Sequence, residues 1–250
     1  MPILKSKHFQ PNQAAEKRFY KALKRVAQIS GHIVEVHADG PTLKNERELI
    51  ASLNEYSKKL GPWAARQSAK MIEQVAKKNK TAWSKGSQQI HKALQTTVAK
   101  TLVGEKAALL MGEQIALIQS IPLRAAERAQ KLAMEAFFNG ERASEIAAEL
   151  ARSGKVSESD AERIARTEVA RANSVITQAR AEAAGSRQYI WRNSGDAAVR
   201  ESHKIYHGKK LDGMVFSWDK PPTLDDGTVG HPGTFPNCRC YPEPFFPPNS

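Results

Sequence analysis

Cysteine, aromatic residues and long apolar runs are all scarce in this sequence. Two cysteines in 250 residues argue against a disulfide-rich secreted scaffold. No run of about 18 apolar residues occurs, and the amino-terminal residues lack the apolar stretch of a signal peptide. Aromatic residues make up only 7% of the chain and alanine is plentiful, which favours a helical protein. We therefore expect a mainly α-helical protein made in the cytoplasm, with no membrane partner.

Acidic residues are few in the first 100 positions. This part holds 19 Lys and Arg against 7 Asp and Glu, a net charge of +12, whereas residues 101–250 carry no net charge. A basic segment joined to a neutral body is typical of proteins that contact a polyanion, most commonly nucleic acid. The alternative is a solvated, lysine-rich helix face.

Residues 51–100 concentrate this basic charge, because Glu55 and Glu73 are the only acidic residues there. Lysines at helical spacing can neutralise phosphates without reading bases, so we expect non-specific contact with double-stranded DNA. No spacing typical of a helix-turn-helix, a zinc finger or an RNA-recognition motif is present in this segment. The predicted contacts are Lys58, Lys59, Arg66, Lys70, Lys77, Lys78, Lys80, Lys85 and Lys92.

Apolar residues recur at helical spacing through most of residues 12–185. Ser159 followed by Glu162 has the form of a capping box, which predicts a helix start. Residues 31–41, which include Gly40-Pro41, are predicted as a break. Helix ends are predicted at Gly61-Pro62, Ile121-Pro122, Asn139-Gly140 and Gly154. The predicted helices are 12–30, 42–60, 63–100 with a break near Gly86, 105–121, 122–139, 141–154 and 159–184.

The composition changes after Gly185. The run QYIWR at residues 188–192 predicts a strand, and eight of the 13 prolines fall in residues 221–248. We expect an elongated, mainly α amino-terminal and middle region with a small α+β carboxy-terminal module. The predicted parts are a basic helical region at 1–104, a helical segment at 105–185, the α+β module at 186–242 and a proline-rich tail at 243–250.

Two segments of the second half share a pattern with a known family. An Ala-Arg-Thr-Glu helix with an Asn shortly after it is followed by a Trp, then Asp-x-x-Val-Arg-x-x-His, a Pro-Gly and a Cys-Arg-Cys. This order resembles the phage Mu F-like minor head protein family, also called phage head morphogenesis proteins, over about residues 135–242. The matching residues are Arg166, Thr167, Glu168, Asn173, Trp191, Asp196, Arg200, His203, Gly208, Phe216, Pro232, Gly233, Cys238, Arg239 and Cys240.

The resemblance implies a non-enzymatic component of the virion. Such proteins lie inside the capsid in few copies, associate with the portal protein and act in head assembly or DNA delivery. The basic residues would then face packaged DNA or the portal. For Arg166, Thr167 and Glu168, the resemblance implies a polar network that holds their helix to the carboxy-terminal module. A DNA-binding protein ejected with the genome is an alternative.

Cys238 and Cys240 form a close thiol pair that predicts a Zn²⁺ site. A structural zinc ion takes four nitrogen or sulfur ligands, and His203 and His231 are the expected partners, with His207 as a competitor. A small module with little apolar content also benefits from such a staple. The alternatives are a strained disulfide, buried thiols without a ligand, with His203 bonded to Asp196 or the backbone, and a catalytic thiol.

Asp196, Arg200 and His203 have the spacing of one helical face. An Asp-to-Arg pair four residues apart supports a helix, and Arg200 could instead be buried against Glu168. The rival function is a metal-dependent nuclease or other hydrolase, in which His203 and Asp196 act as acid and base.

Overall fold

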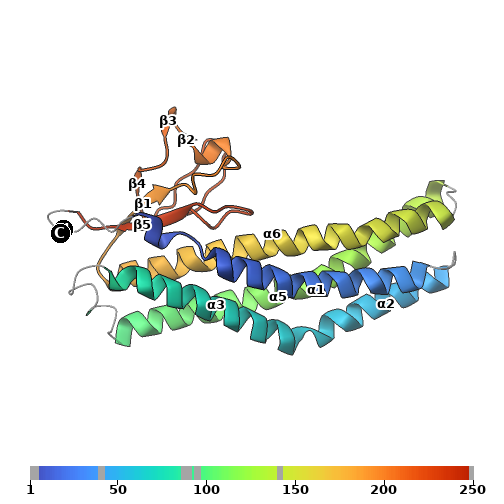
Figure 1. Ribbon diagram of the computed structural model, residues 1–250. Coiled ribbons are helices and arrows are strands. Elements are labelled where there is room, and N and C mark those ends of the chain that lie inside the picture. Colours follow the sequence, from blue (N-terminus) through green and yellow to red (C-terminus); the bar gives the residue numbers. More distant parts are fainter. Residues whose placement is uncertain (1–5, 39–42, 86–91, 93–96, 140–142, 248–250) are drawn as a thin grey trace. The chain divides into compact units, whose positions relative to one another are not determined.

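The computed structural model describes residues 6–38, 43–85, 92, 97–139 and 143–247 (Figure 1). The chain divides into two compact units. The C-terminal unit comprises Met1–Glu16, Lys70–Met111 and Arg166–Ser250, and the helical unit comprises Lys17–Ala69 and Gly112–Ala165. Within the described residues no helix is both long and apolar enough to cross a membrane.

Long helices are followed by short strands, as the sequence predicts. The predicted fold class, mainly α with a small α+β carboxy-terminal module, is confirmed. The helical elements before the sheet are η1 (Ser6–Phe9), α1 (Gln13–Ala38), α2 (Leu43–Lys59), α3 (Gly61–Ser84), α5 (Thr97–Asn139) and α6 (Ala143–Ala183). The elements after them are β1 (Gln188–Arg192), η2 (Glu201–His203), β2 (Ile205–Tyr206), β3 (Lys209–Lys210), β4 (Val215–Ser217) and β5 (Tyr241–Phe245).

Several predicted helix boundaries are confirmed. Helix α2 ends at Lys59 and α3 begins at Gly61, so Pro62 lies in a first turn, where its missing N–H costs no helix bond. Helix α5 ends at Asn139, as predicted. The predicted helix end at residue 30 is wrong, because α1 continues to Ala38 and buries Val34 in an apolar cluster with α2 and α5. The predicted breaks at Gly40-Pro41 and Gly86 lie outside the described residues.

The predicted break at Ile121-Pro122 is wrong, because α5 runs through Pro122 without interruption. A proline inside a helix removes one backbone hydrogen bond. Packing compensates here, since Ile118 and Ile121 are fully buried. Beside them, the Ser57 hydroxyl donates to the Gln119 carbonyl (2.9 Å) and the Gln119 side chain donates back to the Ser57 carbonyl (3.0 Å).

The predicted end at Gly154 and the capping box at Ser159 are also wrong, because α6 is continuous from Ala143 to Ala183. A cap forms only at a helix end, where backbone donors are unsatisfied. Tertiary contacts hold this segment helical. The Arg128 guanidinium donates to the buried Ser157 hydroxyl over 2.8 Å, and Arg124 and Arg128 pair with Asp160 at 3.5 and 3.7 Å.

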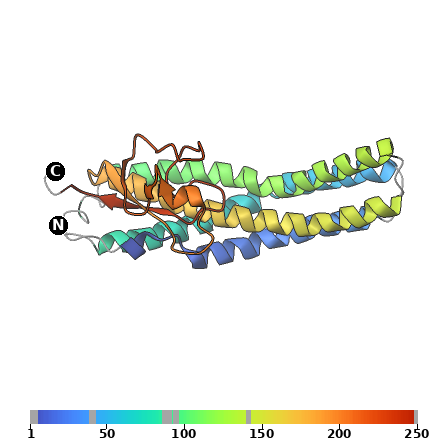
Figure 2. The same ribbon diagram turned by 90° about the horizontal axis from the view of Figure 1, so that it is seen from above.

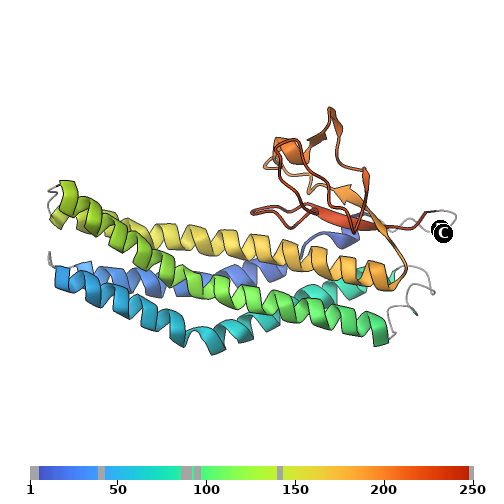
Figure 3. The ribbon, with the colours of Figure 1, turned by 180° about the vertical axis from the view of Figure 1, so that it is seen from behind.

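The helical unit packs segments of α1, α2, α5 and α6. One apolar cluster joins Val34 of α1 to Leu49 and Leu53 of α2 and to Ala125 and Ala129 of α5. The rear view shows these segments side by side (Figure 3). Small alanines on α5 allow the neighbouring helices to approach closely, and Lys24 of α1 pairs with Glu158 of α6 at 3.2 Å.

The sheet of the C-terminal unit has the order β4-β1-β5, and both pairings are antiparallel. The predicted strand at QYIWR is confirmed as β1, whose Tyr189 and Trp191 are fully buried. Strand β5 includes residues 243–245, which the sequence assigned to a proline-rich tail. Prolines are tolerated in β5 because it is an edge strand in this sheet. Seen from above, β5 lies along the last turns of α6 (Figure 2).

The core of the C-terminal unit joins all its segments. Phe9 of η1 meets Trp83 of α3 edge to face at 5.5 Å between ring centroids. The same cluster contains Trp191, Leu211 and both cysteines. A buried polar network lies beside it, in which Asn79 donates to the Thr177 hydroxyl (2.7 Å) and accepts from Arg180 (2.5 Å).

Candidate functional site

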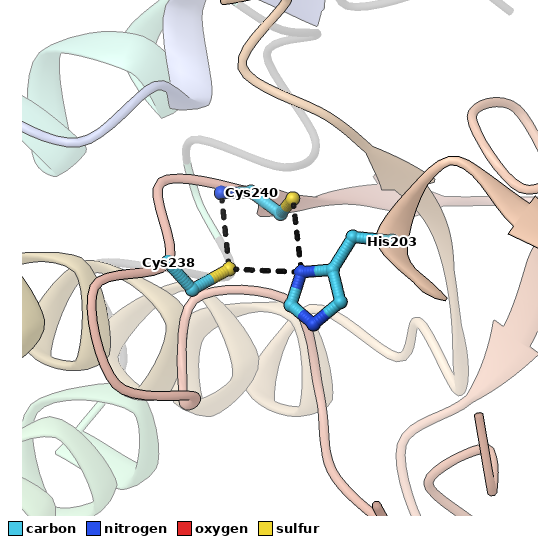
Figure 4. Close-up of side chains that lie close together, drawn as sticks. All are labelled: His203, Cys238 and Cys240. Carbon is cyan, nitrogen blue, oxygen red and sulfur yellow. Dashed lines mark hydrogen bonds between the residues drawn. The ribbon is translucent and has the colours of Figure 1, made fainter. Parts of the chain in front are cut away.

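His203, Cys238 and Cys240 converge at one buried point of the C-terminal unit (Figure 4). His203 ends the short helix η2, and the two cysteines lie in the turn that leads into β5. The Nδ1 atom of His203 lies 3.5 Å from the Cys238 sulfur and 3.6 Å from the Cys240 sulfur. One ligand atom from each residue lies within 4.8 Å of the others, so these side chains can hold a metal ion.

The turn that presents the cysteines depends on glycine and asparagine. Asn237 has a φ of 57° and Gly233 a φ of 90°, which glycine and asparagine adopt most readily. A Cβ atom at Gly233 would lie 2.9 Å from the Cys240 carbonyl oxygen and 3.1 Å from the Ala170 carbonyl oxygen. The Pro-Gly of the motif is therefore explained by a close approach between the turn and helix α6.

The two thiols shift each other's pKa in opposite directions. The hydrogen bond from the Cys240 thiol lowers the pKa of Cys238 well below its usual range, against the effect of burial, and His203 lowers it further. The same bond and burial raise the pKa of Cys240. The Cys240 main-chain N–H also donates to the Cys238 sulfur over 3.3 Å. Neither cysteine is in a disulfide.

The structure brings together three of the four predicted metal ligands and places His231 elsewhere. The Nδ1 atom of His231 lies 3.0 Å from the Tyr189 hydroxyl, and its ring meets the Tyr189 ring edge to face. Burial lowers the pKa of His231. The competitor His207 is exposed, and its main-chain N–H donates to the Asp225 carboxylate at 3.0 to 3.1 Å.

The helix predicted over Asp196, Arg200 and His203 does not form. Arg200 is extended, with φ −60° and ψ 152°, and only the three residues Glu201–His203 make a 3-10 turn. The predicted pairs fail accordingly. Asp196 pairs with Arg239 at 3.8 Å, and the exposed Arg200 donates to the Pro236 carbonyl and is not buried against Glu168. The Arg200 guanidinium therefore bonds to a main-chain carbonyl and not to a carboxylate.

Residues of the motif helix contact the cysteine turn and the start of the chain. The Thr167 hydroxyl accepts a hydrogen bond from the Asn237 main-chain N–H at 2.9 Å. Glu16 pairs with both Arg166 (3.6 Å) and Arg239 (2.9 Å). Further along α6, the Asn173 side chain donates to the Phe9 carbonyl over 2.7 Å.

Two residues of the site belong to none of the motifs that the sequence shows. Glu16 is the only acidic residue among the first 34, and its isolation among basic residues is the signal that marks it. Tyr189 is predicted only as a strand residue, and no local pattern links it to His231. Glu168 is buried, 3% exposed, and lies 4.0 Å from Arg171.

A cavity of about 140 Å³ adjoins the thiol pair. It is lined by the three clustered side chains and by charged groups. Asp196 and His203 share this cavity, but Asp196 is engaged by Arg239, and Nδ1 of His203 faces the two sulfurs. Charged lining residues are Arg166, Asp196, Arg200 and Arg239.

All nine predicted DNA-contacting residues are exposed. Lys58 and Lys59 lie on α2, and Lys59 pairs with Glu55 at 2.5 Å. Lys78 donates to the Pro11 carbonyl over 3.2 Å, and although the residue as a whole is exposed, desolvation of its ammonium group lowers its pKa. Arg66, Lys70, Lys77 and Lys80 lie on α3, and Lys85 and Lys92 follow it.

Comparison with known proteins finds a family match for part of the chain. Residues 127–242 match the family described as Phage Mu protein F like protein. An uncharacterized protein of Haemophilus influenzae (strain Rd) is 30% identical over 147 residues, which cover 59% of this chain and 31% of that protein. The chain thus spans about a third of the length of that relative. No solved structure matches the chain.

Proposed function

We propose that this chain, a member of the Phage Mu protein F like family through residues 127–242, is a minor head protein that binds the portal protein inside a phage capsid. The family match supports a role in phage head morphogenesis. A location in the virion and contacts with other head components follow from the same role. Association with the portal and contact with packaged DNA are the more specific parts of the proposal.

The main observation in support of the proposal is that motif residues far apart in the sequence meet at one junction in the structure. The Asn237 N–H reaches Thr167 across 70 positions of sequence, and Arg166 and Arg239 share Glu16. Each of these polar groups bonds to another part of the chain. Such a junction fixes the shape of a module, which is what an assembly component requires of its binding surface.

Contact with DNA is supported by the distribution of lysine. Lys70, Lys77 and Lys80 are exposed and make no ion pair with any described residue. Inside a filled head, the dominant polyanion is the packaged genome. Lysines arranged in this way bind phosphates and not base edges, so the proposed contact is independent of DNA sequence.

Co-expression with the portal protein of the same phage tests the proposal. We expect the two proteins to elute together in size-exclusion chromatography and to form cross-links between defined lysines. The unaltered chain is compared with Arg239→Gln, which removes the ion pair with Glu16. This variant should bind the portal protein more weakly, because the turn that carries the cysteines is held less firmly. Two proteins that elute separately at every ratio, with no cross-links, would contradict portal binding.

The hydrolase alternative has one observation in its favour, namely that Asp196 and His203 line the same cavity. An acid–base pair in a nuclease must reach the substrate and exchange protons with it. We expect no cleavage of plasmid DNA by the full chain with Mg²⁺, Mn²⁺ or Zn²⁺. Cleavage that His203→Ala abolishes would establish the alternative.

A further inference from the structure

Two separations among three ligand atoms of the C-terminal unit match those around a tetrahedral metal ion. Zinc binds cysteine sulfur at about 2.3 Å and histidine nitrogen at about 2.05 Å. In a tetrahedron, these bond lengths separate sulfur and nitrogen by about 3.6 Å. The Nδ1 atom of His203 lies 3.5 Å from the Cys238 sulfur and 3.6 Å from the Cys240 sulfur. Both separations therefore fit one ion between the three side chains.

Hydrogen bonding alone explains the arrangement less well. A ring nitrogen carries either one proton or one lone pair, so it makes one good hydrogen bond. Here two sulfurs stand at nearly equal distance from the same nitrogen. The other ring nitrogen, Nε2, is buried without a hydrogen-bond partner among the described residues. The ring is thus directed at the sulfur pair through Nδ1, as a metal ligand would be.

Main-chain groups next to the two cysteines point hydrogen bonds at their sulfur atoms. The Cys240 N–H points at the Cys238 sulfur over 3.3 Å, and an N–H donor stabilises the charged form of sulfur. Backbone hydrogen bonds from Gly233 to Cys238 and from Ser194 to Cys240 act in the same direction on the two pKa values.

The fourth ligand does not come from His231. Its Nδ1 is occupied by the Tyr189 hydroxyl, and the group of clustered ligand atoms contains only His203, Cys238 and Cys240 among the described residues. The cavity of about 140 Å³ is lined by these same three side chains. A space of this size holds more than one water molecule, and Arg200 and Arg239 in its lining favour an anion.

We propose that His203, Cys238 and Cys240 bind one Zn²⁺ ion, and that the fourth coordination position faces the adjacent cavity and takes water or a small anion. Two sulfur ligands and one nitrogen ligand suit zinc among the available divalent ions. The ion would link η2 to the turn before β5 and so cross-link two segments of the C-terminal unit. This inference is independent of portal or DNA binding.

Elemental analysis of the purified full chain tests the site. We expect about one equivalent of zinc per chain, as in a single tetrahedral site. His203→Gln and Cys238→Ser should lose the metal, whereas the matched variant His231→Gln should retain it. Circular dichroism identifies variants that fail to fold. Less than about half an equivalent in the unaltered chain, or equal losses in His231→Gln and His203→Gln, would overturn the site.

Cobalt substitution of the unaltered chain tests the open position without any variant. Co²⁺ in place of zinc should give the visible spectrum of a tetrahedral ion with thiolate ligands. Added thiocyanate or inorganic phosphate should shift that spectrum, because either anion can replace water at the fourth position. A tetrahedral spectrum that neither anion shifts, and that His231→Gln alters, would show a closed four-ligand site and overturn the open position.

Discussion

The main-chain N–H of Asn237 donates to the Thr167 hydroxyl over 2.9 Å, although the two residues are 70 positions apart. Thr167 lies in helix α6 and Asn237 lies directly before the cysteine turn. The bond therefore joins the two halves of the family motif. It also helps to hold Asn237 at its positive φ of 57°.

Removal of the Thr167 hydroxyl should loosen this junction. Thr167→Val keeps the shape of the side chain but leaves the Asn237 N–H without its acceptor. We expect the free energy of unfolding to fall by about 1 kcal/mol, the typical net value of one hydrogen bond. Denaturant unfolding measures the change. Thr167→Ser, which keeps a hydroxyl, should cost clearly less, and equal losses in both variants would contradict the role of the bond.

Gly233 should be among the least replaceable residues of the chain. In Gly233→Ala, the new Cβ collides with the carbonyl oxygens of Cys240 and Ala170. The residue must also keep a φ of 90°, which alanine rarely adopts. Gly227→Ala is the matched control, because Gly227 has a φ of 80° but nothing within 4 Å of an added Cβ. The control should cost about 1–2 kcal/mol from backbone strain.

The Gly233 variant should lose at least about 2 kcal/mol more than this control, since backbone atoms cannot move aside cheaply. Thermal or denaturant unfolding compares the two variants directly. Equal losses in both would show that the turn can shift away from α6.

Substitutions of Asn79 and Arg180 should have strongly non-additive effects on the free energy of unfolding. Burial lowers the pKa of Arg180 to about 10, and its guanidinium donates to Asn79 at 2.5 Å and to the Ala76 carbonyl at 3.2 Å. Asn79→Leu should destabilise the protein by about 3 kcal/mol, because it leaves a buried charge with fewer partners. Adding Arg180→Met should recover about 1–3 kcal/mol. Strictly additive losses would rule out the coupling.

His231 should make stability depend on pH below neutrality. Burial lowers the pKa of His231 in the folded state, so the unfolded chain binds a proton more tightly. The stability that His231 contributes is therefore fully present above its unfolded value of 6.5 and is lost as the pH falls toward the folded pKa. His231→Gln should flatten this part of the stability curve and leave its shape above that value unchanged. An identical slope in both proteins would contradict the assignment.

Lysines of α3 should contribute to DNA affinity more than lysines of the sheet module. Lys77→Gln with Lys80→Gln should lower affinity for duplexes of any sequence and reduce the slope of log affinity against log salt by about 2. The matched control, Lys209→Gln with Lys210→Gln, removes the same charge from another exposed site of the C-terminal unit. Equal effects of the two pairs would favour a diffuse charge effect over a defined surface.

Much of the fold could be predicted from local signals. Gly61-Pro62 and Asn139 mark true helix ends, and the β-branched and aromatic run at 188–192 forms the central strand. The helix ends predicted at Pro122 and Gly154 are wrong because long-range packing determines that the helices continue through both positions. Ile118 and Ile121 are buried at one, and Arg128 reaches Ser157 near the other. Neither contact leaves a local trace in the sequence.

The candidate site could be predicted only in part for a similar reason. The motif order links His203 to the cysteines, and these three residues do meet. His231 lies near the cysteines in the sequence, which suggests a ligand. In the structure, however, its ring nitrogen contacts the hydroxyl of Tyr189 in strand β1. The spacing of Asp196, Arg200 and His203 suits a helix, yet Arg200 turns to the Pro236 carbonyl. Partners distant in sequence decide each of these cases.

Quantitative mass spectrometry of purified, DNA-filled heads tests the proposed function most directly. We expect this chain to be present in a small, fixed ratio to the portal protein, with cross-links that join it to the portal. Heads that lack the chain entirely, while it accumulates outside them in the same infected cells, would contradict the proposed function.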